Sequence, residues 1–428
     1  MQESLLHYIW QLQYFDYTDL KSVSGEPIQV LHPGYRNTHA GPDFSNARIR
    51  IGEIEWIGNV EIHISSSGWH DHKHHHDPAY ENVIVHVVWE NDLNVNRRDG
   101  SSIPTVELKT RVSQHLLLRY NNLVLNPETI PCASSILEVK ELTRLSMFDR
   151  ALMFRLESKA ENVYQMLKLN HHDWEETTYQ LLCRNFGFKI NSDPFTMLAK
   201  SLPYKILRKH ADKPLQVEAL LFGQAGFLED EHVDEYSQNL QREFSVLNRK
   251  FSLLERRLNK AQWKLLRLRP ANFPTIRLAQ LSSFIASQQN IYSAFISAEG
   301  YADLAALLNI ETSEYWKNHY LFGRRVKGTV PSMGKMSIDN IIINTVIPLL
   351  VATGKMRDDQ MFVDKAVSIL QSVSSEENVI IKKWNTLGIK SKAAADSQGL
   401  LELYNNFCLR KRCLDCNIGS ALIRPTPS

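Results

Sequence analysis

Short stretches in which apolar residues alternate with polar ones, or follow one another without a break, dominate the N-terminal part of the chain. Such stretches are typical of β-strands, whose successive side chains point to opposite faces. An amphipathic pattern over Ser4–Phe15 predicts a helix ahead of them. The predicted strands are Ile28–Leu31, Arg48–Ile51, Ile54–Ile64, Val83–Trp89 and Val106–Leu108.

Two details predict how these strands are arranged. Only Gly52-Glu53 separates the second stretch from the third, which predicts a hairpin turn between them. Val83–Trp89 is almost continuously apolar, which is typical of a central strand buried on both faces.

From about Glu138 onward the helical period replaces the strand pattern, without a clean short repeat. Pro127 and Pro131 interrupt the pattern where the two regions meet. We therefore expect an α+β protein with an α/β domain over residues 1–135 and a large all-α domain over residues 136–428.

Candidate chemistry first appears around Glu61. In Val60–Ile64 the apolar residues face one side of the predicted strand, and Glu61 and His63 face the other. Asp43 precedes them in a Gly-Pro-Asp-Phe turn. Two carboxylates held by adjacent strands form a small site for a hard divalent cation such as magnesium or manganese. The alternative is that Asp43 serves only its turn and that Glu61 and His63 are solvated side chains.

Pro42-Asp43, a gap and Glu61-x-His63 resemble the Asp…Glu-x-Lys pattern of metal-dependent nucleases, with histidine in the place of lysine. The resemblance implies a restriction-endonuclease-like core and a hydrolase that cleaves DNA or RNA. Asp43 and Glu61 would bind the cation, and His63 would act as general base or transition-state donor. A neutral imidazole lacks the permanent charge of lysine, so a non-catalytic binding scaffold with a degenerate nuclease core stays open.

The chain is also similar, along nearly its whole length, to a bacterial family, mainly from Bacteroidetes, designated domain of unknown function 2851. The segments that carry this similarity are the Gly41–Phe44 turn, Trp56–His63, Trp69–Tyr80, Asn82–Val88, Ile103–Thr105, Phe222–Gly226, Arg269–Pro274 and the C-terminal cysteines. The similarity implies a family and no mechanism.

A histidine-rich segment follows the Glu61 strand. His70, His72, His74, His75 and His76 occur together, and imidazole is a common ligand of zinc and nickel. The residues that match the family, and that we select as accessory candidates, are His72, His74, Asp77 and Tyr80. A solvated polar loop is the alternative. If the histidines bind metal, the protein could instead be a metalloenzyme that acts on a small substrate.

His86 is the one polar residue of the apolar stretch Val83–Val88 and needs a partner there. We expect either a satisfied core histidine or a site residue that reaches Glu61 or the bound ion.

Three of the five cysteines cluster as Cys408-x4-Cys413-x2-Cys416. Cys132, which follows a proline at the domain boundary, is the candidate for a fourth ligand, and Cys183 has the place of a buried core residue. Four thiolates suit zinc or an iron–sulfur cluster, and x4 then x2 is a ferredoxin-type spacing. Three reduced structural thiols are the alternative.

The helical region contains a basic window. Leu240, Phe244, Leu247, Phe251, Leu254 and Leu258 form one predicted apolar helix stripe. The bases around it are Arg242, Arg249, Lys250, Arg256, Arg257, Lys260, Lys264, Arg267, Arg269 and Arg277. From these we select Arg249, Lys250, Arg256, Arg257, Lys260 and Lys264 as candidate contacts to nucleic-acid phosphates. A solvated helix whose bases pair with acids elsewhere is the alternative.

Composition narrows the class of protein. The hydrophobic fraction is 43% and the charged fraction 22%, which is typical of a soluble protein with a sizeable core. Asn344, Thr345 and Pro348 interrupt the longest apolar region, and we expect no membrane span.

The N-terminus lacks a signal-peptide pattern, so we expect a cytoplasmic protein. No phosphate loop, dinucleotide fingerprint or serine-hydrolase elbow occurs, which disfavours those enzyme classes.

Overall fold

The computed structural model describes residues 1–229, 234–266 and 268–425, and it divides the chain into two compact units. The first unit combines Met1–Met147 with the segment that begins at Leu403, and the second unit is Phe148–Glu402. The expected division placed residues 403–428 in the helical domain, whereas their described part lies with the N-terminal unit. The fold is mixed: a sheet near the N-terminus precedes a helical region, as expected.

The sheet of the first unit has the strand order β1-β3-β4-β5-β6, and β2 pairs with β3 at one side. The strands are β1 (Ile28–His32), β2 (Tyr35–Arg36), β3 (Phe44–Ile51), β4 (Ile54–Ser65), β5 (Val83–Glu90) and β6 (Thr105–Glu107). β1, β3 and β4 are antiparallel neighbours, whereas β4, β5 and β6 run parallel. The sheet is therefore mixed.

The predicted hairpin between β3 and β4 is present. Ile51 pairs with Ile54 across the turn, and Gly52 has a φ of +59°, a backbone conformation that glycine adopts readily. At the other end of the same pair, Phe44 is opposite Val60. This register places Asp43, just before β3, beside Glu61 of β4.

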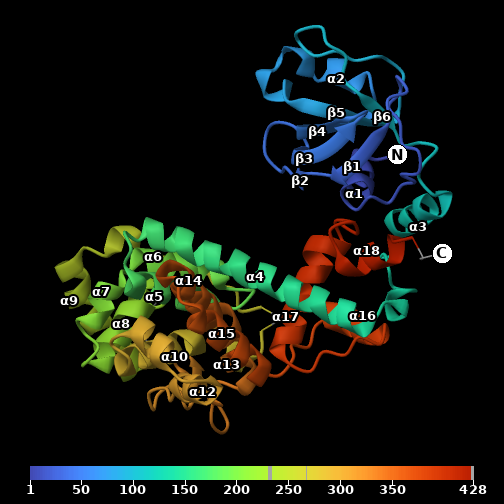
Figure 1. Ribbon diagram of the computed structural model, residues 1–428. Helices are drawn as coiled ribbons and strands as arrows, with labels where there is room; N and C mark the ends of the chain where they lie inside the picture. Colours follow the sequence, from blue (N-terminus) through green and yellow to red (C-terminus); the bar gives the residue numbers. More distant parts are fainter. Residues whose placement is uncertain (230–233, 267, 426–428) are drawn as a thin grey trace. The chain divides into compact units, whose positions relative to one another are not determined.

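Helical segments connect β4 to β5, and a helix packs on the sheet. Helix α1 (Glu3–Gln11) packs against β4 (Figure 1). The connection from β4 to β5 contains α2 (Gly68–Asp71) and two 3₁₀ turns, η1 (His74–His76) and η2 (Pro78–Tyr80). Val83–Val88 of β5 is completely buried, which confirms the expected central strand. Glu61 and His63 are also buried, so their side of β4 is not an open polar face.

The first unit also contains a helix that follows the sheet and a helix from the C-terminal segment, and these two helices pack together. Helix α3 (Gln114–Val124) contacts α18 (Asn417–Ile423). The hydroxyl of Tyr8 in α1 lies 2.8 Å from the hydroxyl of Ser420 in α18. A turn of π-helix, η8 (Leu403–Cys408), precedes α18 and carries the first cysteine of the C-terminal cluster.

The second unit is built almost wholly of helices. Helix α4 (Glu141–Leu169) begins before the unit boundary and continues into this unit. The helices that follow are α5 (Trp174–Phe186), α6 (Ser192–Ser201), α7 (Tyr204–Arg208), α8 (Pro214–Gln224), α9 (Glu235–Phe251), α10 (Pro274–Ser287), α11 (Ile291–Ser297), α12 (Tyr301–Leu308), α13 (Lys335–Ile341), α14 (Ile347–Arg357), α15 (Gln360–Ser372), α16 (Val379–Thr386) and α17 (Ala394–Glu402). A small hairpin, β7 (His319–Leu321) with β8 (Arg324–Arg325), is an addition that the sequence pattern did not predict.

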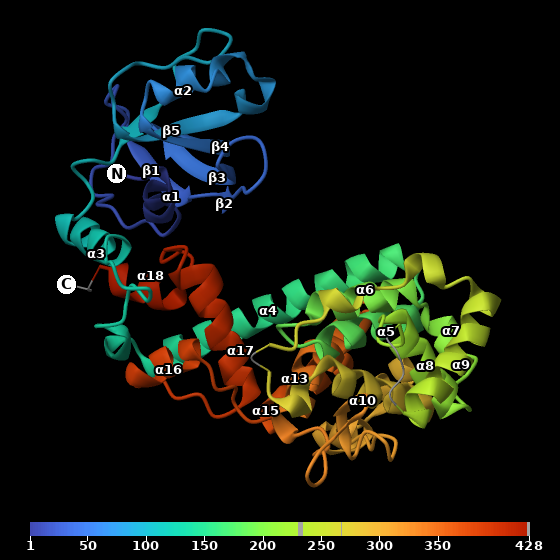
Figure 2. The ribbon, with the colours of Figure 1, turned by 180° about the vertical axis from the view of Figure 1, so that it is seen from behind.

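The family-like segment Phe222–Gly226 ends helix α8, as a glycine cap predicts. Gly226 has a φ of +81°, and the amide of Phe227 donates to the carbonyl of Phe222 across the helix end. A Cβ on Gly223 would lie 2.2 Å from the ring of Phe244, so this glycine lets α9 pack closely on α8 (Figure 2). The segment therefore serves the packing of the helical unit.

Helix α9 is shorter than the predicted apolar stripe. It ends at Phe251 because Ser252 adopts the left-handed conformation, with a φ of +52°. Leu240, Phe244 and Leu247 are buried as expected, but Leu254 lies beyond the helix and is 54% exposed. The prediction of a single apolar helix stripe that extends to Leu258 was therefore wrong.

The most apolar helical stretch is Lys335–Arg357, in which α13, a π-helical turn (η7, Ile342–Val346) and α14 form one continuous helix. It is long and apolar enough to cross a membrane, contrary to our expectation that the polar interruptions make it too short. Most of it is buried inside the helical unit, so its length and composition also fit a core helix.

Candidate metal centre

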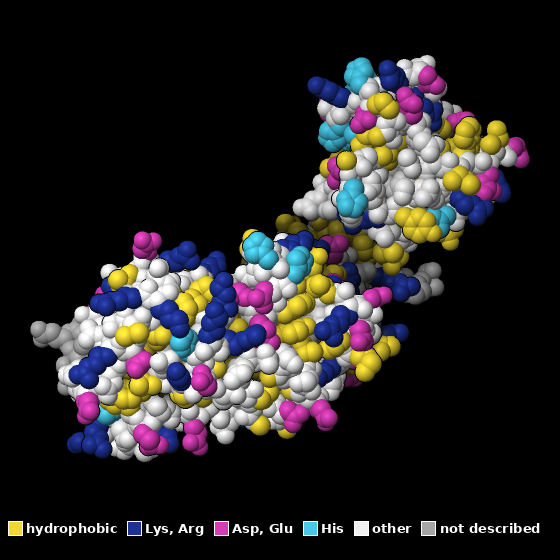
Figure 3. All heavy atoms as spheres, turned by 90° about the vertical axis from the view of Figure 1, so that its left-hand side faces the viewer, with side chains coloured by type: hydrophobic (Ala, Val, Ile, Leu, Met, Phe, Trp, Pro, Cys, Tyr) yellow, Lys and Arg dark blue, Asp and Glu magenta, His cyan; other side chains and the backbone are white. Residues whose placement is uncertain are grey.

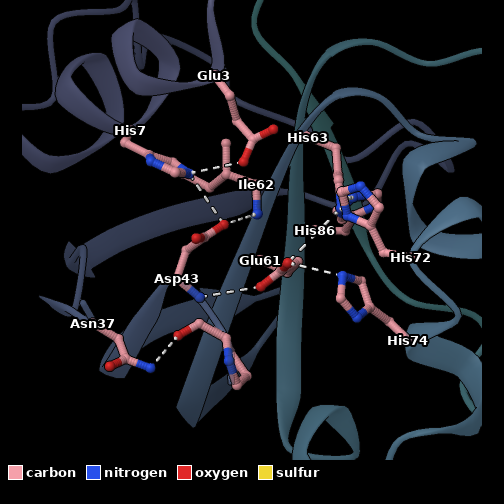
Figure 4. A network of polar contacts seen from close by, with 11 residues as sticks. Glu3, His7, Asn37, Asp43, Glu61, Ile62, His63, His72, His74 and His86 are labelled. Atoms are coloured by element: carbon pink, nitrogen blue, oxygen red, sulfur yellow. Dashed lines mark hydrogen bonds and ion pairs between the residues drawn. The ribbon is translucent and has the colours of Figure 1, made fainter. Parts of the chain in front are cut away.

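Glu61 is at the centre of a polar cluster in the first unit (Figure 4). Its side chain is buried, and its Oε2 atom accepts a hydrogen bond from the backbone amide of Asp43, over 3.1 Å. Its Oε1 atom lies 3.2 Å from Nε2 of His74 and 3.8 Å from Nε2 of His63. Burial raises the pKa of the Glu61 carboxyl, and the nearby Asp43 adds to this effect, while the contact with His74 opposes it.

Asp43 is held by the same pair of strands. Its Oδ2 atom accepts from the backbone amide of Ile62, over 3.0 Å. The two acidic residues are thus tied to each other through the backbone: each carboxylate accepts from an amide at or next to the other. This reciprocal arrangement follows from the β3–β4 register and fixes both carboxylates without a side-chain contact between them.

Helix α1 contributes two residues that the sequence analysis missed. Nε2 of His7 lies 3.2 Å from Oδ2 of Asp43 and 3.7 Å from Oε1 of Glu3. The ligand-type atoms of Glu3, His7 and Asp43 all lie within 4.8 Å of one another. Glu3 and His7 are four residues apart on one helix face, and that spacing was the available signal.

A second close group adjoins Glu61 on its other side. The ligand-type nitrogens of His63, His72 and His74 also lie within 4.8 Å of one another. His63 comes from β4, and the other two come from the connection between β4 and β5. The structure therefore places Asp43 in one group and His63 in another, with Glu61 between them. Within the described residues, Asp43 and Glu61 do not appear together in one such group.

His63 is the middle member of a row of three imidazoles. Its Nδ1 atom lies 2.9 Å from Nε2 of His86, and its Nε2 atom lies 3.1 Å from Nδ1 of His72. Burial lowers the pKa of His63 to about 4, and the neighbouring His74 and His72 add to the shift. Burial likewise lowers the pKa of His86 to about 3. Both rings are therefore neutral at pH 7, which is the form that binds metals.

His86 reaches His63 and not Glu61. It is opposite Glu61 in the parallel β4–β5 register, but its ring contacts the neighbouring histidine. Its Nδ1 atom is buried and has no hydrogen-bond partner among the described residues. His86 is therefore bonded on one side of its ring only, to His63.

Aromatic packing orients the histidine group. Tyr80 stacks on His74 with ring centroids 3.8 Å apart, and the buried Trp69 contacts both rings edge-on. A Cβ on Gly68 would lie 2.7 Å from the ring of His63, so only glycine allows α2 to approach so closely. The pocket of His63 therefore depends on the residue type at position 68.

The remaining accessory candidates are placed apart from the centre. Asp77 caps η2 by accepting from the amide of Ala79, which is a structural role. His75 contacts His70 and His76 rather than Glu61.

The four candidate cysteine ligands, Cys132, Cys408, Cys413 and Cys416, line one small cavity in the first unit, and all are buried. Cys183 is buried in helix α5 of the other unit, as expected for a core residue. The five cysteines, all of them among the described residues, form no disulfide.

The basic window is only partly available to a ligand. Arg249, Lys250, Arg256, Lys260 and Lys264 are exposed, but Lys260 has an interaction of its own and Arg257 forms an ion pair with Glu229. Arg277 is buried and donates to Gln280, Asn272 and Ser337, so it supports the fold. Arg267 lies outside the described residues. On the face shown in Figure 3, Lys and Arg side chains occur among Asp and Glu side chains.

Comparisons with known proteins give one result. A family model described as a protein of unknown function (DUF2851) matches residues 3–379. Neither the curated proteins nor the solved structures gave a match. The matched span includes both close groups of ligand-type residues and Cys132, and it ends before the C-terminal cysteines. The chain belongs to the DUF2851 family of proteins of unknown function.

Proposed function

We propose that this protein is a divalent-metal-dependent phosphodiesterase that cleaves DNA or RNA with its first unit. The order of elements supports a restriction-endonuclease-like core: a helix, three antiparallel strands, a helical connection and a strand parallel to the third. Asp43 precedes the second strand of this core, β3, and Glu61 is in the third, β4, where two strands can present carboxylates to one cation.

The observation that carries the proposal is that two buried imidazole nitrogens lack a hydrogen-bond partner and face carboxylates. Nε2 of His7 and Nε2 of His74 are buried and have no hydrogen-bond partner among the described residues. Each nevertheless lies 3.2 Å from a carboxylate oxygen, of Asp43 and Glu61 respectively. Buried polar atoms are rarely left without a partner. An imidazole nitrogen at this distance from a carboxylate oxygen, with no other partner, is placed as the two ligands of a shared metal ion would be.

The roles of the residues follow from this arrangement. Asp43 and Glu61 would hold the ion, with His7 as a third ligand from α1. A bound divalent ion lowers the pKa of a water molecule and neutralises charge on the phosphate. His63 is neutral and lies beside Glu61, so it can accept a proton from the attacking water. The exposed His72 is hydrogen-bonded to His63 and provides a path for that proton to solvent.

The test is cleavage of single- and double-stranded DNA and RNA with magnesium or manganese. Glu61→Gln keeps the shape of the side chain and its acceptor for the Asp43 amide, but removes the charge that binds metal. We expect it to lower the rate at least about 100-fold while the fold is retained. Glu55→Gln, on the exposed part of the same strand, is the matched control and should stay active.

Changes at His63 separate its role from metal binding. His63→Ala should lower the rate about 10²–10⁴-fold without loss of the metal, as for removal of a general base. His63→Lys restores the nuclease pattern and should preserve or raise activity. If wild-type protein cleaves no substrate with any divalent metal, or if Glu61→Gln is as active as wild type, the phosphodiesterase proposal is wrong and the binding scaffold replaces it.

A second candidate function has its own observation. His63, His72 and His74 together with Glu61 form a nitrogen-rich set, which suits zinc or nickel better than magnesium. Such a site would belong to a metalloenzyme that acts on a small substrate. Purified protein that retains zinc or nickel, together with inactivity towards nucleic acids, would favour this candidate over the first.

A further inference from the structure

Four of the five cysteines meet from two distant parts of the chain. Cys132 is in the turn after Pro131, Cys408 ends the π-helical turn η8, and Cys413 and Cys416 precede α18. All four line the same small cavity. Among the residues that the structure describes, Arg412 supplies the one polar side chain that lines this cavity besides the cysteines.

The backbone around Cys413 and Cys416 is built for close approach. The amide of Cys416 donates to the carbonyl of Cys413, which closes a tight turn. A Cβ on Gly419 would lie 2.2 Å from that same carbonyl oxygen, so glycine is required where α18 passes the turn. Lys411 has a φ of +52°, an uncommon conformation for a residue other than glycine. These features hold the sulfurs around the cavity.

Burial disfavours the ionised form of three of the four thiols. Burial raises the pKa of Cys132 to about 12 and that of Cys413 to about 11, and neighbouring cysteines add to both shifts. Burial raises the pKa of Cys408 as well. Thiolates are the metal-binding form of cysteine, and a metal site deprotonates its thiols outright.

The spacing of the sulfurs distinguishes a single ion from a larger group. Four sulfurs around one zinc ion at about 2.3 Å lie about 3.8 Å from one another. Among the described residues, two groups of three ligand-type atoms lie within 4.8 Å of one another, and neither contains a cysteine. No three of the four sulfurs form such a group, so their spacing is wider than that of the ligands around a single zinc ion. An iron–sulfur cluster is larger, and cysteines that surround it stand further apart.

We propose that Cys132, Cys408, Cys413 and Cys416 bind an iron–sulfur cluster that joins the C-terminal segment to the Cys132 turn. The cluster has a structural role in the first unit and is independent of the metal at Glu61. It secures α18, which contacts α3 and bonds to Tyr8 of α1.

The primary test is the metal content of wild-type protein purified without oxygen. We expect iron and acid-labile sulfide in equal amounts and a visible charge-transfer absorbance. One zinc ion per chain would overturn the cluster in favour of a zinc site. Absence of both iron and zinc from anaerobically purified protein would overturn metal binding altogether. None of these results depends on catalytic activity.

Two variants assign the ligands. Cys416→Ser should lose the iron, whereas Cys183→Ser, in the other unit, should keep it. Loss of iron in Cys416→Ser could also result from misfolding of the variant. The second measurement therefore removes the cluster oxidatively from wild-type protein. Removal should expose the segment after Leu403 to protease while the sheet stays protected. Iron retained in Cys416→Ser would contradict the assigned ligand. An unchanged protease pattern after removal of the cluster would contradict its structural role.

Discussion

Glu61 combines two properties that seldom coexist at a buried carboxylate. It is 5% exposed, and its nearest charged or polar neighbours are imidazoles and another acid rather than lysine or arginine. A buried carboxylate without a cation is costly, so either a proton or a metal ion must supply the positive charge. The imidazoles of His63 and His86 are kept neutral by burial and do not supply it.

His7 provides a specific test of the ligand set. His7→Ala should weaken manganese binding about 10–100-fold, because it removes a nitrogen that faces Asp43 from α1. Titration calorimetry on protein freed of metal by a chelator measures this affinity directly.

The control for that measurement is His39→Ala, since His39 is exposed in the same unit. Its affinity should match that of wild-type protein. An unchanged affinity in His7→Ala would mean that α1 contributes no ligand and that the ion, if bound, is held by the strands and the histidine segment alone.

Local pattern predicted the residues of the centre that come from strands and missed those that come from a helix. Glu61 and His63 stand out because polar residues interrupt an apolar strand, and Asp43 stands out because of its turn. Glu3 and His7 look like ordinary polar residues of an amphipathic helix. Only the packing of α1 on β4 brings them to Asp43, and that packing has no signature in either segment alone.

The elements themselves follow the sequence closely where a period is clear. The predicted strands appear with their ends shifted by a few residues, because alternation and continuous apolar runs report burial directly. The end of α9 was mispredicted because Ser252 adopts a left-handed conformation, which no side-chain pattern reveals. The hairpin β7–β8 is too short to show a period.

The long helix α13–η7–α14 carries a polar contact to α4. Asn344 lies in its π-helical turn and accepts from the ammonium group of Lys159 on α4. Gln398 accepts from the same group. Burial lowers the pKa of Lys159 to about 7, and the nearby Arg155 adds to the shift.

This lysine predicts a pH dependence for the helical unit. Lysine in the unfolded chain keeps its ordinary pKa near 10.4, so between pH 7 and pH 10 the unfolded state binds more protons than the folded state. The free energy of unfolding should therefore rise with pH in this window, by about 2 kcal/mol between pH 7 and pH 9.

Urea denaturation at several pH values measures the effect. Lys159→Met should remove most of the slope, whereas Lys200→Met, an exposed position on α6, should leave it unchanged. A slope that is the same in Lys159→Met and wild type would assign it to other groups.

At the scale of the whole chain, the segment that begins at Leu403 belongs to the first unit, which the expected domain division did not include and only the cysteines indicated. Residues after Leu403 are helical in pattern, and so they resemble the second unit. Their cysteines were the only signal of a connection to Cys132, because chemistry, and not periodicity, links the two segments.

Exposed bases of the helical unit predict a contribution to substrate binding. Changing Arg249, Lys250 and Arg256 to Glu should weaken DNA binding, because each change removes a cation that would pair with a phosphate in the proposed complex. A plot of the logarithm of the binding constant against the logarithm of the salt concentration should become less steep. Its slope should change by about one unit for each phosphate that the variant no longer neutralises. Fluorescence anisotropy at several salt concentrations, with metal removed to prevent cleavage, measures both quantities.

A second triple variant tests whether position matters or only net charge. Lys382, Lys390 and Lys392 are exposed in the same unit but belong to the region of α16 and the loop after it. Their change to Glu alters the net charge equally. Equal weakening by the two variants would show that binding follows net charge and that the window around α9 is not a contact surface.

The position of a bound Mn²⁺ ion tests the metal centre most directly. Anomalous diffraction from crystals grown with manganese locates the ion without reference to activity. We predict a peak about 2–2.5 Å from carboxylate oxygens of both Asp43 and Glu61, with Nε2 of His7 as a further ligand. A peak confined to His63, His72 and His74, or no peak in the first unit at manganese concentrations that saturate binding, would contradict the account.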